Sequence, residues 1–162
     1  MDDPSDTAKR RDGETAGEQA RYERNLYGWA VEQAALLRAG RIAEADALNI
    51  AEELDDVGNE QYDKLESALR IILMHLLKWD HQAQRRSRSW RSSIVVQRNH
   101  VRKVLRKNPG LKPLVDEATA EAYRDARVLA AAEMDCDERD IAAHCPYTWN
   151  EIMERSIDWP PG

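Results

Sequence analysis

Residues 60–82 read EQYDKLESALRIILMHLLKWDHQ, and this stretch decides the fold. Its apolar residues recur with the 3.6-residue period of an α-helix. One stripe consists of Tyr62, Leu65, Leu69, Ile72, Leu76 and Trp79, and further apolar residues spread around the other sides. Because a helix that is apolar nearly all round has to be covered on most sides, the sequence predicts a central helix over about 60–82.

Helical patterns also flank this central helix on both sides, and no convincing alternating strand pattern occurs. Further helices are expected over about 26–39, 44–57 and 111–134, and from a cap at Ser87 or Ser89 to about Lys107. The sequence Thr148-Trp149-Asn150-Glu151 is a capping box that opens a short last helix. The predicted fold class is therefore all-α: a helical bundle of four to five main helices plus a short C-terminal helix.

The sequence predicts three details of this bundle. Gly58-Asn59 is expected to break or kink the chain between the second helix and the central helix. The second helix is expected to face inward with Ala47, Ile50, Ala51, Leu54 and Val57. The fifth helix carries many alanines, including Ala118, Ala122 and Ala126, which indicates close approach to a neighbouring helix.

Composition predicts the domain organisation and the compartment. Residues 1–21 are polar and charged and are predicted to be a disordered tail, and residues 22–159 are predicted to form a single α-helical domain. No apolar run approaches the roughly 20 residues that span a bilayer, and the N-terminus has no apolar stretch typical of a signal peptide. With only two cysteines, a cytoplasmic protein without a membrane partner is expected.

Charge is distributed unevenly. From Lys78 to Lys107 there are ten Lys or Arg residues and one acid, Asp80, whereas Ile42–Glu66 holds nine acids and one Lys. The candidate binding face consists of Arg85, Arg86, Arg88, Arg91, Arg98 and Arg102. Arginine forks suit carboxylates, so these side chains are expected to pair within the fold or across a dimer. The alternative is binding of nucleic acid or polyphosphate, against which the net charge of −6 counts.

No catalytic or metal constellation stands out. His75 with Glu52 or Glu53 on a neighbouring helix is the only carboxylate–imidazole pairing worth inspecting, and His75 is expected to be a core histidine. The Glu-x-x-His pairs of di-metal bundles are absent, and Cys136, His144 and Cys145 lack the spacing of a zinc site. No glycine-rich phosphate loop is present, so nucleotide-dependent catalysis has no support. No metal or other cofactor is predicted.

Six blocks of the sequence resemble a known family. They read YGWAVEQAALLRAGR (27–41), AEEL (51–54), LMHLLKW (73–79), RRSRSWR (85–91), EAYRDAR (121–127) and CPYT (145–148). In this order they are similar to the bacterial "domain of unknown function 29" family, over roughly residues 22–156. The resemblance implies an all-helical bacterial protein and implies no activity, cofactor or site residue.

Together these features favour a non-enzymatic protein-interaction or assembly module in which polarised charge directs binding to a protein partner or a second copy. Nucleic-acid or polyphosphate binding through the Arg85–Arg102 region is the second hypothesis, and an enzyme of unknown type is the third.

Overall fold

A computed structural model describes residues 21–158. The chain divides into two compact units, one up to Val57 and one from Gly58 onward. All regular structure in the described range is helical, without a strand, so the predicted all-α class is confirmed. The predicted disordered tail and the domain end at Trp159 lie outside the described residues, apart from Arg21, which is helical. The single domain over 22–159 therefore stays a prediction.

The first unit is built around a polar network rather than a large apolar core. It contains α2 (Leu26–Arg38), the short 3₁₀ helix η1 (Ile42–Glu44) and the start of α3 (Ala47–His81). Buried Trp29 donates its ring N–H to Asp46 Oδ2 at 3.2 Å, and Asp46 N donates to Gln33 Oε1 at 2.9 Å. Tyr22 lies edge-on to Trp29 and donates to Glu53 at 2.7 Å. Hydrogen bonds thus fix α2 against the first turns of α3.

The expected break at Gly58-Asn59 is wrong, because α3 runs without interruption from Ala47 to His81. A glycine inside a helix costs about 1 kcal/mol relative to alanine, but it keeps its N–H and removes no hydrogen bond. Nothing lies within 4 Å of the position that a Cβ of Gly58 would take. The helix therefore continues through a residue that weakens it without ending it.

The expected inward face of residues 44–57 is also wrong. Leu54 is 66% exposed and Val57 is 58% exposed, Ala47 and Ala51 are exposed as well, and only Ile50 is half-buried. The periodicity identified the apolar face of this segment correctly. It does not determine whether anything covers that face.

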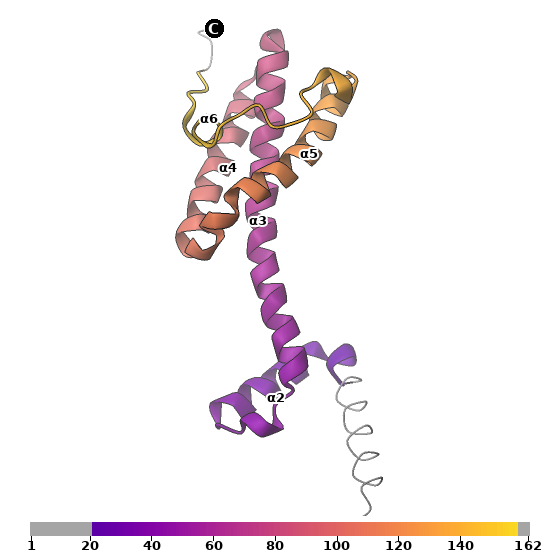
Figure 1. The fold of residues 1–162 in the computed structure, drawn as a ribbon, viewed down its shortest axis with the longest axis vertical. Helices are drawn as coiled ribbons and strands as arrows, with labels where there is room; N and C mark the ends of the chain where they lie inside the picture. The colour runs from indigo at the N-terminus through magenta and orange to yellow at the C-terminus, as the bar shows by residue number, and fades with distance from the viewer. Residues whose placement is uncertain (1–20, 159–162) are drawn as a thin grey trace, which may run out of the picture. The chain divides into compact units, whose positions relative to one another are not determined.

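The second unit holds the main core. After α3 come η2 (Ala83–Arg85), α4 (Arg88–Lys107), η3 (Pro109–Leu114), α5 (Val115–Met134), η4 (Glu138–Asp140) and α6 (Trp149–Glu154). Figure 1 shows α4 and α5 packed along the C-terminal half of α3, with α6 beside α4. In agreement with the prediction for the central helix, Leu65, Leu69, Ile72 and Leu76 are fully buried.

Local signals set most helix boundaries in this unit. Ser87 accepts a hydrogen bond from Trp90 N at 3.2 Å and caps α4, and Thr148 and Glu151 form the predicted capping box of α6. The fifth helix begins at Val115 rather than near Leu111. The segment before it is 3₁₀-helical, because Pro113 has no N–H to donate and disfavours α-conformation in the residue before it.

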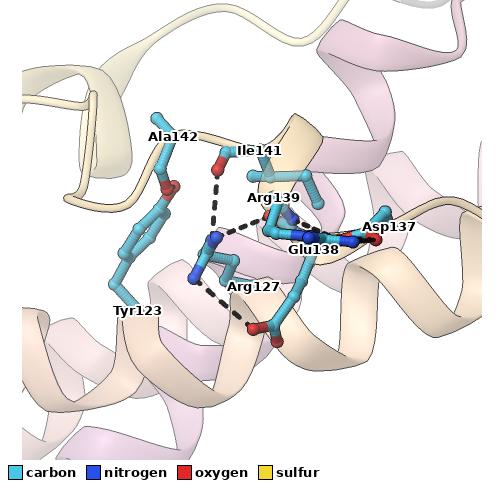
Figure 2. A network of polar contacts seen from close by, with 7 residues as sticks. All are labelled: Tyr123, Arg127, Asp137, Glu138, Arg139, Ile141 and Ala142. Carbon is cyan, nitrogen blue, oxygen red and sulfur yellow. Dashed lines mark hydrogen bonds and ion pairs between the residues drawn. The ribbon is translucent and has the colours of Figure 1, made fainter.

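The loop after α5 is held by side chains of α5 itself (Figure 2). Arg127 donates to the carbonyls of Ile141 at 3.1 Å and Glu138 at 2.6 Å, and Tyr123 donates to the carbonyl of Ala142 at 2.7 Å. These bonds fix the chain on its way to α6. Among the helices of residues 21–158, none is long and apolar enough to cross a membrane.

Candidate functional site

Three of the six candidate arginines hold the C-terminal segment. Arg98 is only 7% exposed, and its guanidinium donates to the carbonyls of Ile152 at 2.7 Å, Arg155 at 2.8 Å and Glu151 at 3.1 Å. Arg102 donates to the carbonyl of Met153 at 3.0 Å and forms an ion pair with Glu154. We call these residues, with Arg91, which donates to the carbonyl of Ile157 at 3.0 Å, the arginine clamp.

The arginine clamp supplies what the end of a short helix lacks. The last carbonyls of a helix have no partner within the helix and carry its negative dipole end. In α6 the carbonyls of residues 151–153 are in this position, and Arg98 and Arg102 bind all three. The arginines are therefore compensated mainly by peptide carbonyls. This differs from the pairing with the acidic segment 42–66 that the sequence favoured.

Of the other three candidate arginines, one is bound within the fold and two are exposed. Arg86 donates to the carbonyl of Trp79 at 2.9 Å and lies over the Trp79 ring, 5.1 Å from its centroid. Arg85 and Arg88 are exposed and make no hydrogen bond or ion pair with another side chain of the described chain. The basic face available to a ligand is therefore much smaller than the sequence indicated.

Asp80, the single acid of the basic stretch, also binds the C-terminal segment. It pairs with Arg155 through two contacts, of 2.6 and 3.1 Å, and accepts a hydrogen bond from Tyr147 at 2.9 Å. Burial raises the pKa of Asp80, but the hydrogen bonds from Arg155 and Tyr147 outweigh it and hold the pKa below its ordinary value. Asp80 thus remains an anion. It binds Tyr147, which precedes α6, and Arg155, which follows α6, to the end of α3.

His75 lies beside a buried cation instead of a carboxylate partner. The centroid of its ring is 6.4 Å from that of the Trp90 ring. The ammonium of Lys78, a residue that is 5% exposed, lies 4.4 Å from the centroid of the Trp90 ring and pairs with Glu133. Nδ1 of His75 is buried and has no hydrogen-bond partner among residues 21–158. Burial, and then the nearby Lys78 charge, lower the pKa of His75 below its ordinary value.

The proposed partners of His75 do not face it across two helices. Glu52, Glu53 and His75 all belong to α3, and Glu53 instead accepts the hydrogen bond from Tyr22. The pairing rested on a second helix separate from the central one, and that separation does not exist. His75 therefore has no carboxylate arranged for acid–base chemistry within this pairing.

His75 should make stability depend on pH. The folded state holds it neutral, whereas the unfolded chain takes up a proton as the pH falls through about 6.5. The free energy of unfolding should therefore decrease between about pH 7.5 and 5.5. In urea unfolding at both values, His75→Leu should remove part of this decrease, whereas Met74→Leu should retain it. An unchanged pH dependence in His75→Leu would contradict the assignment.

The sequence of this chain matches a known protein family. The model described as "Domain of unknown function DUF29" matches residues 21–158. The chain belongs to the DUF29 family. This confirms the resemblance seen in the sequence. No curated protein and no solved structure matches the chain. Because the family's description names no activity, it assigns no role to any residue of this DUF29 chain.

Metal chemistry gains no support from side-chain positions. In the described part of the DUF29 chain, no group of three or more His, Cys, Asp or Glu side chains is placed to hold a metal ion. Cys136 is exposed, Cys145 is half-buried, and neither forms a disulfide. Burial raises the pKa of the Cys145 thiol, which disfavours the nucleophilic thiolate.

Sequence reasoning missed two surfaces of this DUF29 chain. One is the exposed apolar stripe of α3, which we call the open stripe and define as Ala47, Ala51, Leu54 and Val57. The other is a pocket formed by α4, η3 and α6, in which Trp149 lies among basic side chains. The sequence contained the signal for the first, an apolar period. The second brings together residues distant in sequence and had none.

Proposed function

We propose that this DUF29 chain is a non-enzymatic protein-interaction module, and that its open stripe binds a basic amphipathic helix of another protein. The observation that carries the proposal is the exposure of Leu54 and Val57 on a helical face. Ala47, Ala51, Leu54 and Val57 follow one another at intervals of four, three and three residues, which is the spacing of a helix-binding face. Scattered apolar residues are ordinary on a surface, but a stripe along one helix face is typical of a partner site.

Charge decides which partner suits the open stripe. On a helical wheel Asp55 lies next to one edge of the stripe and Glu53 next to the other. Between Arg41 and Lys64 the chain has eight acids and no Lys or Arg. A second copy paired along the same face would bring like charges together, whereas a helix bearing Lys and Arg beside its apolar face would neutralise them. We therefore favour a basic partner over a homodimer.

The contacts of the arginine-rich stretch argue against the alternative function, nucleic-acid binding. Four of its six candidates, Arg86, Arg91, Arg98 and Arg102, already donate to backbone carbonyls of the same chain. Of the six candidates only Arg85 and Arg88 lack such a contact within residues 21–158, far fewer than the roughly six to ten phosphate contacts of a strongly salt-dependent nucleic-acid binder. We propose no nucleic-acid function for this stretch. The proposal also places the chain in the bacterial cytoplasm, and its two unpaired cysteines are in keeping with a reducing compartment.

A helical peptide of leucine and lysine in an amphipathic pattern is the probe for this proposal. It should bind the full chain in fluorescence anisotropy, whereas the glutamate version of the peptide should not. Replacing both Leu54 and Val57 with Gln should weaken binding at least about tenfold, because burial of each side chain is worth about 1.5–3 kcal/mol when complete. Both residues are exposed in the free chain, so the fold should be unaffected.

Leu48→Gln is the matched control. Leu48 is 85% exposed and lies outside the open stripe, about 120° around the helix from Leu54 and about 180° from Val57, so its replacement should change the affinity less than about twofold. Equal loss in the control and the double variant would mean that the peptide binds by charge alone, and the proposal would then be wrong. Light scattering that shows a dimer disrupted by the double variant would identify a second copy as the occupant and would overturn the choice of a basic partner.

A further inference from the structure

The pocket between α4, η3 and α6 combines an apolar interior with a basic edge. It has a volume of about 410 Å³ and is lined by Arg102, Leu105, Arg106, Pro109, Lys112, Trp149, Met153 and Glu154. Leu105 is half-buried and Met153 is buried, while Trp149 is 36% exposed. Small-molecule sites have volumes of about 300–1,000 Å³ and combine apolar walls with a few polar groups. This pocket has both properties.

The charges in the pocket are unequally engaged. Glu154 pairs with Arg102, and Arg102 also donates to the carbonyl of Met153 as part of the arginine clamp. Arg106 and Lys112 are exposed, and neither makes an ion pair with a described residue. Three cations and one carboxylate leave a net charge of +2 at the pocket. The positive charge left for a ligand is therefore that of Arg106 and Lys112.

We propose that this pocket binds a nucleoside monophosphate: a phosphate monoester held by Arg106 and Lys112, joined to a flat ring that stacks on Trp149. This site is independent of the open stripe and of the protein-interaction function proposed for it. Two cations without internal partners match a phosphate monoester, which carries about −1.5 to −2 charges at neutral pH, better than a single carboxylate. Arginine and lysine are both established phosphate ligands, the first as a fork and the second as a point charge.

Trp149 accounts for the second part of the ligand. Exposed tryptophan beside cations is the arrangement on which bases stack, and the interaction tolerates any base because each has a flat π-face. Leu105 and Met153 line the same pocket and add apolar surface to it. A ligand that carried only the anion would leave these apolar side chains uncovered. We therefore expect the ring and the phosphate to contribute separately to affinity.

Isothermal titration calorimetry with the full chain and adenosine monophosphate tests this inference. The wild type should show saturable binding, and both adenosine and inorganic phosphate should bind at least about tenfold more weakly than the nucleotide. Replacing both Arg106 and Lys112 with Gln should weaken nucleotide binding at least about tenfold, since hydrogen bonds to charged groups are the stronger class. Trp149→Leu should weaken it about fivefold or more, the lower end of the range for loss of stacking.

The matched control replaces Arg85 and Arg88 with Gln. It removes the same charge from two exposed arginines outside the pocket, so it should keep the wild-type affinity. Equal loss in the control would show a general charge effect and would overturn the site. Absence of saturable nucleotide binding by a wild type that remains helical by circular dichroism would overturn it too. Phosphate binding as tightly as the nucleotide would contradict the role of Trp149.

Discussion

Replacing Arg98 with alanine should lower the free energy of unfolding by about 3 kcal/mol or more. The Arg98 guanidinium lies at 7% exposure and donates to three carbonyls, those of Glu151, Ile152 and Arg155. Removal of a donor to buried acceptors costs their full desolvation, and here three acceptors lose their donor together. For a chain of this size the melting temperature should fall by roughly 10 °C.

The large effect comes from the position of Arg98 at the end of a helix. Helix α6 has only six residues, so it forms few internal hydrogen bonds and depends on outside contacts. Its side chains Ile152 and Met153 are buried in the same core as α4. Loss of Arg98 should therefore free the C-terminal segment as well as unpair carbonyls. Compared with the wild type, Arg98→Ala should show faster hydrogen exchange over residues 149–158 and a smaller change over α5.

Two further variants separate the arginine clamp from a general effect of charge. Arg88→Ala removes the same charge from an exposed side chain on the same helix, and it should change stability by less than about 0.5 kcal/mol. Arg98→Lys keeps the charge but loses the planar fork, so it should also be strongly destabilised. If denaturant unfolding shows equal stability for Arg98→Ala and Arg88→Ala, the carbonyl contacts do not stabilise the fold as described.

Features that depend on neighbouring residues along the chain could be predicted from the sequence. Thr148 and one of the two serines expected to cap the fourth helix, Ser87, each accept the expected backbone hydrogen bond. A cap needs only a short polar side chain and the backbone two or three residues further on. The apolar period of the central helix was predictable for the same reason, because it follows from helix geometry alone.

The partners of the arginines could not be predicted in this way. Arg98 and Arg102 bind backbone carbonyls more than fifty positions away, and every residue has such a carbonyl, so no residue type marks the acceptor. The acidic segment looked like the partner because carboxylates are visible in a sequence. Similarly, Gly58 looked like a break, although its cost of about 1 kcal/mol is small beside the packing of a long helix.

The alanine face of α5 gives the second large expected effect. Ala118, Ala122, Ala126 and Ala130 are completely buried and follow one another every four residues, so they form one row along the helix. They belong to the same core as the leucines of α3. A methyl side chain at each of these positions lets the helix backbone come close to its neighbours, in agreement with the prediction from the sequence.

Ala126→Leu should destabilise the chain by about 1–3 kcal/mol, because a close-packed core accommodates a larger side chain only by moving backbone or straining rotamers. Ala120→Leu is the control: Ala120 is exposed on the same helix, and leucine has nearly the helix propensity of alanine, so its effect should stay within about 0.5 kcal/mol. Ala126→Gly removes the buried methyl group and should cost about 1 kcal/mol through helix propensity and about 0.8 kcal/mol more through the lost burial. Denaturant unfolding of the three variants would measure these differences. If Ala126→Leu were as stable as Ala120→Leu, α5 would have room beside its neighbours that a row of fully buried alanines does not allow.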